Sequence, residues 1–502
     1  ALKAVTGYGY TAAGQLSKTT LPSGQTVSYT YDDAGRLIKV SDNLGNQIAY
    51  RLDLIGNVLS TETKDGSGAL SHAVSHSYDT MNRLTRASGA NHVDTYAYDA
   101  LGNRLSERNG LNQTTGYSYD ALSRLVKVNQ ADSGAVQVGY TPLDQVTKVV
   151  GARNEATQYS VNGLDQRQKT VSADTGQTVY THDANGNVLS QSDALGNQTL
   201  YTYDALNRLT SVKTKDSLQR LTYDEDGAAR PGHIGWLTGV VSNEFKHNYQ
   251  YDGFGRLIAS TQTRLKYNQT QVTQYRYTAG GQLFNMTYPS GLKVDYQYMS
   301  GQVSSVLING KAHLSQIKYN GLGQLVGGVF ANGERLKRTY NSSGDATGTA
   351  LASYGLDAAG TIKSIMSTPN SAVSVTQINQ SITLGYDAMN RLTRWEDTYT
   401  QTPAAGTKIN TTATADYTWD TNANRQSSLL NQSSQVNTQA ATTTNNTQTL
   451  QYGAGNRLTH NVTTRVVGTM SNATKQAIAL DAAGNTKQDG FRQYTYNALN
   501  QL

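Results

Sequence analysis

The segment YDALNRL at residues 203–209 decides the fold, because variants of it recur along the whole chain. Close copies read YDDAGRL at residues 31–37, YDGFGRL at residues 251–257 and YDAMNRL at residues 386–392. Ten of the 21 intervals between successive units are 21 residues long, which predicts a repeat architecture. Named by the tyrosine or its substitute, the units lie at 10, 31, 52, 78, 98, 119, 140, 161, 182, 203, 223, 251, 277, 298, 319, 340, 356, 386, 419, 452, 480 and 496.

Each unit is expected to form two short β-strands and two tight turns. Residues 27–31 and 36–40 alternate β-branched or aromatic residues with small polar ones, which is typical of a strand with two unlike faces. About 44 such strands follow one another, whereas twisted open sheets rarely exceed about ten strands without curling. The predicted fold is therefore all-β, a continuous coiled single β-sheet of repeated hairpins.

The residue four positions after the tyrosine predicts the turn conformation. It is Gly in twelve units and Asn in five more, and both residues enter the left-handed backbone region at low cost. A short hairpin loop commonly ends on such a residue. We therefore expect Asn to replace a glycine such as Gly255 with little effect, because the chain makes that exchange between its own units.

The aspartate after the tyrosine is interpreted as a turn former, since its carboxylate can accept hydrogen bonds from nearby amides. It occurs thirteen times, so these aspartates are expected to be interchangeable and not catalytic. The residues assigned to the structural signature are Tyr31, Asp32, Gly35, Arg36, Tyr78, Asp79, Asn82, Tyr98, Asp99, Tyr119, Asp120, Tyr203, Asp204, Asn207, Arg208, Tyr251, Asp252, Gly255, Arg256, Tyr386, Asp387, Asn390 and Arg391.

Composition limits how such a sheet can be stabilised. Hydrophobic residues make up 37% of the chain even with 33 tyrosines counted, which is thin for two apolar sheets packed face to face. Tyrosine suits another arrangement, in which each ring packs on its neighbour one strand away and the hydroxyl stays in water. The sequence therefore predicts ladders of tyrosine rings.

Several classes of function are disfavoured. The chain has no cysteine, its net charge of +6 is spread over scattered lysines and arginines, and no apolar run approaches 18 residues. We therefore expect no thiol chemistry, no nucleic-acid partner and no membrane span. No nucleophile elbow, Walker loop, dinucleotide fingerprint or zinc motif appears. We predict no catalytic residue, cofactor or metal, including at His72 and His76 or in the Asp183–Asn187 turn, which lacks the full calcium-loop pattern.

The organisation expected along the chain is one β-shell segment over residues 1–502. Regular repeats occupy residues 1–222 and 251–355, an inserted loop rich in Gly and Pro occupies residues 224–236, and irregular, longer repeats occupy residues 356–502. The chain starts at Ala1 and stops inside a unit at Leu502, so we expect a part of a longer polypeptide.

The iterated signature Tyr-Asp-x-x-Gly/Asn-Arg-Leu resembles the YD repeat of the Rhs family, over essentially all 502 residues. That family includes bacterial polymorphic toxins, shell components of insecticidal Tc toxins and, more distantly, teneurins. The resemblance implies a hollow shell that commonly encloses a toxic C-terminal domain. Many members carry an Asp-Pro-x-Gly segment that supports self-cleavage. This chain has no Asp-Pro dipeptide, so no catalytic residue is carried over.

Two functions follow as hypotheses, neither of them enzymatic. In the first, the chain is a structural shell segment that encapsulates a toxic cargo for secretion or delivery. Its partners would be a cargo domain of the same polypeptide or of a partner chain, and secretion-system or shell-closing components. In the alternative, a cell-surface or extracellular YD-repeat protein acts in adhesion or in carbohydrate or protein recognition. The resemblance implies a secreted or cell-surface bacterial protein, and the segment contains no signal peptide.

Overall fold

The computed structural model describes residues 4–224, 235–367, 377–402, 408–436, 439, 442–453, 456–467, 470–489 and 491–497. These residues form an all-β structure, with one three-residue 3-10 helix at Leu265–Tyr267. Forty-one strands belong to one sheet, and two short strands pair with each other near the end of the chain. The inserted loop expected at 224–236 falls largely outside the described residues.

The first part of the sheet consists of short strands, most of them five to seven residues long. In chain order they are β1 (Gly7–Tyr10), β2 (Leu16–Thr20), β3 (Thr26–Tyr31), β4 (Leu37–Asp42), β5 (Gln47–Leu52), β6 (Val58–Lys64), β7 (Leu70–Tyr78), β8 (Leu84–Ser88), β9 (Val93–Tyr98), β10 (Arg104–Arg108), β11 (Thr114–Tyr119), β12 (Leu125–Asn129), β13 (Ala135–Tyr140), β14 (Val146–Val150), β15 (Ala156–Val161), β16 (Arg167–Ser172), β17 (Gly176–His182), β18 (Val188–Ser192), β19 (Gln198–Tyr203), β20 (Leu209–Lys213), β21 (Leu218–Tyr223), β22 (Leu237–Val241), β23 (Phe245–Tyr251), β24 (Leu257–Arg264), β25 (Gln269–Tyr277) and β26 (Leu283–Thr287).

Strands of ten to twelve residues appear only later, where the spacing of the units widens. The remaining strands are β27 (Lys293–Met299), β28 (Gln302–Ile308), β29 (Lys311–Tyr319), β30 (Leu325–Phe330), β31 (Arg335–Tyr340), β32 (Ala346–Thr349), β33 (Ala352–Leu356), β34 (Ile362–Ser367), β35 (Gln377–Tyr386), β36 (Leu392–Thr402), β37 (Ile409–Trp419), β38 (Arg425–Val436), β39 (Thr442–Tyr452), β40 (Leu458–Val467), β41 (Met470–Ala477), β42 (Ala479–Leu480) and β43 (Thr486–Gln488).

Strand pairing alternates between two patterns along the sheet. Within a unit the two strands pair up to the tyrosine, where a β-bulge shifts the register: Thr30 faces Lys39, but Tyr31 faces Leu37. Between most of the regular units the ladder is short, whereas between the long strands it reaches eight residue pairs. Strands β2 and β3 pair only at Lys18–Ser28, Thr19–Val27 and Thr20–Thr26, and the same three-pair pattern recurs between β12 and β13 and between β18 and β19. The backbone ladder between units therefore stops before it reaches the tyrosine.

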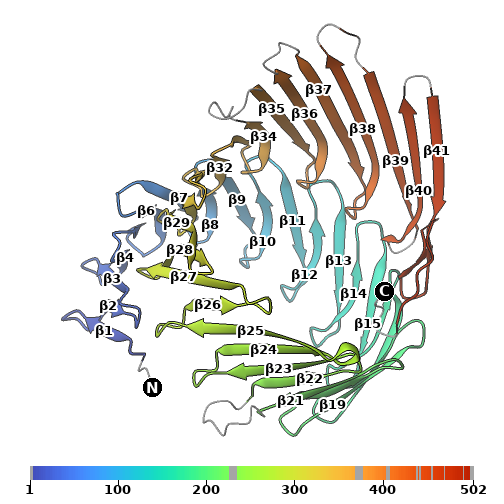
Figure 1. Ribbon diagram of the computed structural model, residues 1–502, viewed down its shortest axis with the longest axis horizontal. Coiled ribbons are helices and arrows are strands. Elements are labelled where there is room, and N and C mark those ends of the chain that lie inside the picture. The colour runs from blue at the N-terminus through green and yellow to red at the C-terminus, as the bar shows by residue number, and fades with distance from the viewer. Residues whose placement is uncertain are drawn as a thin grey trace.

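The sheet winds into a spiral whose successive coils touch along their edges (Figure 1). One edge carries the signature turns, which follow the tyrosines, and the other carries the linking turns, which connect one unit to the next. Signature turns of the second coil contact linking-turn regions of the first, between residues 250 to 303 positions apart. The contacts join Asn43 to Ser300, Ser71 to Gly321, His92 to Asp345, Asp132 to Arg391, Arg153 to Asn422 and Asp174 to Arg457. We call this line of contacts the seam.

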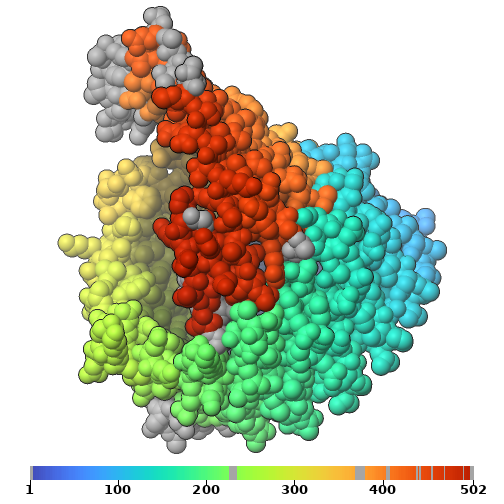
Figure 2. Space-filling model, turned by 90° about the vertical axis from the view of Figure 1, so that its right-hand side faces the viewer, coloured from blue at the N-terminus to red at the C-terminus, as the bar shows by residue number. Residues whose placement is uncertain are grey.

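The wall surrounds a hollow, which Figure 2 shows between the yellow-green strands and the red C-terminal strands. Among the described residues the only buried hydrophobic side chains are Ala259 and Ala415, and no large side chain is fully buried. A single sheet has no second layer to cover it, so the apolar and aromatic side chains remain half-buried. The coiled single sheet predicted from the sequence is confirmed.

The left-handed turn conformation is confirmed wherever the structure describes the glycine or asparagine. Gly102 has φ +91°, and Asn207 has φ +59°. The position is left-handed even where other residues occupy it, as at Ser123 with φ +60° and Ala423 with φ +63°. The expectation that Asn could replace Gly255 is wrong, because a Cβ at Gly255 would collide with the Trp236 ring.

We predict that Gly102→Val lowers the free energy of unfolding by about 1–2 kcal/mol, because a β-branched residue is strained at positive φ. Gly102→Asn should be nearly silent, since no atom lies within 4 Å of a Cβ placed there. Chemical denaturation of both variants measures the difference. Equal losses in the two would contradict the role of backbone conformation at this turn.

Candidate functional site

The signature residues form a repeated set of hydrogen bonds that begins with the aspartate. The Oδ1 atom of Asp204 accepts hydrogen bonds from the amides of Leu206 at 2.9 Å and Arg208 at 3.0 Å. The amide of Asn207 donates to the carbonyl of Asp204 at 3.0 Å and closes a four-residue turn, and the amide of Asp204 donates to the carbonyl of Arg208 at 3.0 Å. The same carboxylate bonds occur at Asp32, Asp79, Asp99, Asp120, Asp252 and Asp387.

The second carboxylate oxygen binds the side chain of the residue at the end of the turn. Oδ2 of Asp204 accepts from Nε of Arg208 at 2.7 Å. The amide of Arg208, followed by its guanidinium, holds the pKa of Asp204 below its ordinary value although partial burial opposes this. Where asparagine replaces the aspartate, its amide instead donates to an acceptor, as Asn162 does to Oε1 of Gln166 at 2.7 Å. When the residue that starts the turn changes from an acceptor to a donor, the residue that ends the turn therefore changes from a donor to an acceptor.

The arginine joins each signature turn to the next one. Nη1 of Arg36 donates to the carbonyl of Asp53 at 2.7 Å, and Nη1 of Arg83 donates to that of Asp99 at 2.6 Å. The Arg83 guanidinium also lies 4.9 Å from the centre of the Tyr98 ring, a cation–π contact. Equivalent contacts join Arg124 to Tyr140, Arg208 to Tyr223 and Arg256 to Tyr277.

The tyrosine hydroxyl joins each unit to the unit before it. Tyr203 donates to the carbonyl of Val188 at 3.0 Å, and Tyr31 donates to that of Leu16 at 2.9 Å. Each acceptor begins the second strand of the preceding unit, at the point where the ladder between units has stopped. The same bond is made by Tyr78, Tyr98, Tyr119, Tyr251 and Tyr386.

The expectation that these hydroxyls stay in water is wrong. They are drawn into the sheet because the short ladder between units leaves a backbone carbonyl that needs a donor. Burial accordingly raises the pKa of Tyr203, Tyr251 and Tyr386. At unit 419 the indole of Trp419 makes the same bond, donating from Nε1 to the carbonyl of Leu392 at 2.8 Å.

The other side chains considered from the sequence lie elsewhere. His72 and His76 both lie on β7, and the Nδ1 atom of each is buried without a hydrogen-bond partner. The Asp183 carboxylate accepts bonds from Asn185 and Asn187 of its own turn, which is the role of the other repeat aspartates. Within the described ranges no group of three or more His, Cys, Asp or Glu residues is placed to hold a metal ion.

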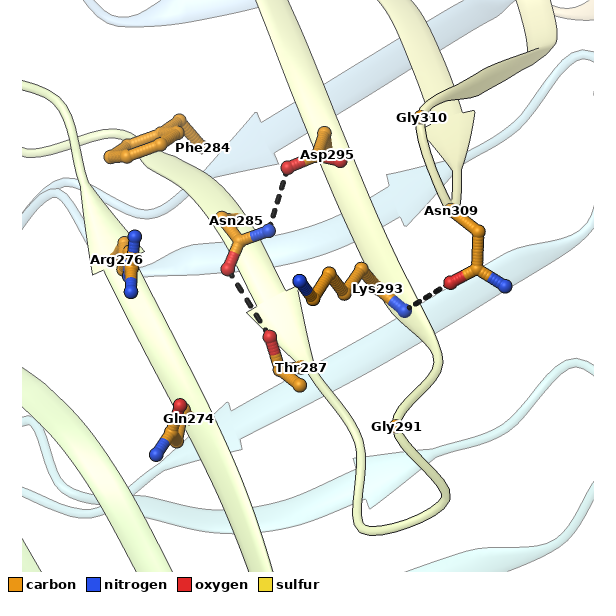
Figure 3. A pocket seen from close by; sticks show the side chains of 10 residues that line it. All are labelled: Gln274, Arg276, Phe284, Asn285, Thr287, Gly291, Lys293, Asp295, Asn309 and Gly310. Atoms are coloured by element: carbon orange, nitrogen blue, oxygen red, sulfur yellow. Dashed lines mark hydrogen bonds between the residues drawn. The ribbon is translucent and has the colours of Figure 1, made fainter.

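A cavity of about 690 Å³ lies over strands β25 to β28 (Figure 3). Its lining includes Arg276, Phe284, Asn285, Lys293 and Asp295. The polar side chains partly bind one another: Nδ2 of Asn285 donates to Oδ1 of Asp295 at 2.6 Å. The cavity is a mixed-charge surface hollow of the sheet, and its lining contains no histidine or serine that could act as a base or nucleophile.

The seam contains the functional residues that sequence reasoning missed. Arg391 was assigned only to the repeat signature, yet its Nη2 atom also lies 3.0 Å from Oδ2 of Asp132 in the other coil. Nη1 of Arg153 likewise lies 3.3 Å from Oδ2 of Asp420. Both partners are more than 250 positions away, and one sequence contains no signal that pairs residues at that separation.

Comparison with protein-family models finds the RHS repeat at residues 10–47, 31–70, 98–135 and 182–219, each match starting at a unit position. All four matches lie within residues 10–219, so this part of the chain contains RHS repeats. The chain is also similar to solved structures. A crystal structure of TcdB2–TccC3–TEV shares 14% identity with a TM-score of 0.61, and a Photorhabdus luminescens Tc holotoxin pore with a TccC3 mutation shares 13% with a TM-score of 0.62.

Each of these two alignments covers 99% of this chain but only 29% of the solved chain. At this identity the likeness establishes a common shell-like fold. No curated protein sequence matches this chain. Across the described ranges, no helix is long and apolar enough to cross a membrane.

We predict that Tyr203→Phe destabilises the sheet by about 1 kcal/mol, the usual net worth of one hydrogen bond, because the Val188 carbonyl loses its donor. Tyr267→Phe is the matched control, since its side chain is 66% exposed on the 3-10 helix. Thermal and chemical denaturation measure both. A Tyr203→Phe variant as stable as the control would contradict the role of the hydroxyl.

A second prediction concerns the paired turn positions. Asp204→Asn should lower the Tm, because the new amide faces the Arg208 guanidinium as a second donor. Arg208→Gln should also lower it by removing the ion pair. The double variant recreates the Asn162–Gln166 pair, so its loss should be smaller than the sum of the two single losses. Strictly additive losses would show that the two side chains are not coupled.

Proposed function

We propose that this chain is a wall segment of a bacterial Rhs shell that encloses a toxic polypeptide for secretion or delivery. The observation that carries the proposal is the seam, which joins one coil of the sheet to the next through hydrogen bonds and ion pairs. A coil without a seam would be an open ribbon, whereas a seamed coil is a continuous wall around a hollow (Figure 2). The toxin names of the structurally similar proteins support the same proposal.

On this proposal the wall is structural and not enzymatic. The signature residues hold neighbouring units together, and residues 1–502 act as one shell segment with regular repeats first and longer repeats after residue 356. The cargo would come from the same longer polypeptide or from a partner chain, with other components closing the openings. The protein would act outside the bacterial cell or at its surface.

The test is protease protection of the cargo in the protein that contains this segment. The enclosed polypeptide should resist a protease that cleaves the same polypeptide when it is expressed alone. Replacing Asp132 and Arg153 by Ala removes two seam partners and should increase cleavage several-fold. Arg394→Ala is the control. The Arg394 side chain is half-exposed, and it pairs with Glu396 of its own strand and with Asp416 of the neighbouring strand.

Circular dichroism would confirm that the seam variant keeps its β-structure. Cleavage of the wild-type cargo at the rate of the isolated polypeptide would overturn the container function. That outcome would favour the recognition alternative, in which the outer surface and not the hollow is functional.

A further inference from the structure

A second cavity lies where two consecutive units lack the signature tyrosine. It has a volume of about 560 Å³ and extends over units 140 to 182. Val161 and His182 occupy the tyrosine position in these units and both line the cavity. Tyr159, Tyr180 and Arg167 complete one side of it.

Neighbouring units show what normally fills this space. At unit 140 the Tyr140 hydroxyl donates to the carbonyl of Leu125 at 2.8 Å, and the ring lies 4.9 Å from the Arg124 guanidinium. At unit 203 the Tyr203 hydroxyl donates to the carbonyl of Val188 in the same way. Leu125 and Val188 each begin the second strand of a unit. A phenol ring with its hydroxyl on that carbonyl is therefore the standard occupant.

At the cavity the strand starts that surround the phenol in other units are kept, while the phenol is missing. Val146 and Arg167 begin the second strands of their units and line the cavity, so they hold the positions of Leu125 and Val188. Val161 has no hydroxyl and is smaller than a phenol. The arginine that covers the ring in other units is replaced by Gln145 in unit 140. The cation at this cavity is instead Arg167, which holds the leucine position of its own unit and whose guanidinium lies 4.7 Å from the centre of the Tyr159 ring.

In the other units without tyrosine, a larger side chain than valine occupies the tyrosine position. Units 52, 356 and 480 carry the larger Leu, and unit 419 carries Trp419, whose indole restores the hydrogen bond. Only at Val161 and His182 do two consecutive units lack the ring. The resulting gap is within the 300–1,000 Å³ range typical of small-ligand sites.

We propose that this cavity binds a phenol ring, the side chain of a tyrosine presented by another polypeptide segment. The ring takes the place vacated at Val161, beside Tyr159, and its hydroxyl donates to the carbonyl of Val146 on the neighbouring strand β14. The lining contains Asp144 and Asp165 as well as Arg167, and Asp144 is already paired with Arg124 at 2.8 Å, so no single charge selects an ionic ligand and the neutral phenol binds. The proposal rests on the repeat geometry alone and holds whether or not the chain is a container; in a container, the enclosed polypeptide would supply the tyrosine.

The probe is 4-methylphenol, with toluene as the analogue that lacks the hydroxyl. Titration followed by ligand-observed NMR and by the Tm of the protein should give saturable binding of 4-methylphenol, at least fivefold tighter than that of toluene. Val161→Tyr should weaken binding of 4-methylphenol at least tenfold and raise the Tm, because the chain then supplies its own phenol.

Val179→Tyr is the matched control. Val179 is 39% exposed on β17, and it alternates with Tyr180, so it points to the opposite face of the same strand. This variant should bind 4-methylphenol as the wild type does. If Val161→Tyr fails to fold, Val161→Leu adds the side chain found at units 52, 356 and 480 and should weaken binding at least threefold.

Three outcomes would overturn the proposal: no saturable binding, equal affinity for toluene and 4-methylphenol, or equal losses in the Val161 and Val179 variants. Protease protection of a cargo does not depend on any of these results, so the container function and this site can fail separately.

Discussion

The hydrogen bond from a tyrosine hydroxyl to the backbone of the preceding unit is the interaction on which the rest of the structure depends. The ladder between β18 and β19 has only three residue pairs, and the bond from Tyr203 to the Val188 carbonyl joins these strands beyond the point where the ladder ends. A two-stranded hairpin is marginal by itself. The tyrosine therefore turns a string of hairpins into one sheet.

The hydrogen bonds of the turn and the tyrosine bond act together to hold neighbouring units in place. The Asp204 carboxylate orders its own turn and orients Arg208, and Arg208 reaches Asp224 of the next unit and covers the Tyr223 ring. The tyrosine, the aspartate and the arginine of the motif thus each have a partner in their own unit or an adjacent one. A structure stabilised in this way needs little buried apolar area, which explains a chain of this length in which Ala259 and Ala415 are the only buried hydrophobic residues described.

The seam is a different kind of interaction, because the chemistry of its partners changes from one contact to the next. Its partners are a histidine and an aspartate at His92–Asp345, an ion pair at Arg391–Asp132, and an amide–carbonyl contact at Arg153–Asn422. Signature turns of the second coil carry small or polar tips such as Ser343 and Asn422 where they meet the first coil. The repeated hydrogen bonds therefore stabilise the wall, whereas particular residues at single turns join one coil to the next.

The sequence by itself determined the repeat, the all-β class, the coiling and the left-handed turns, because these depend on residues at most a few tens of positions apart. Gly102 and Asn207 could be interpreted from backbone sterics alone. The tertiary structure decided which groups the tyrosines bind, why Gly255 cannot accept a side chain, and which turns form the seam. These depend on the position of the β-bulge, on the Trp236 ring and on the pitch of the coil. The coil pitch places Arg391 beside Asp132 across 259 positions, a separation at which local pattern contains no information.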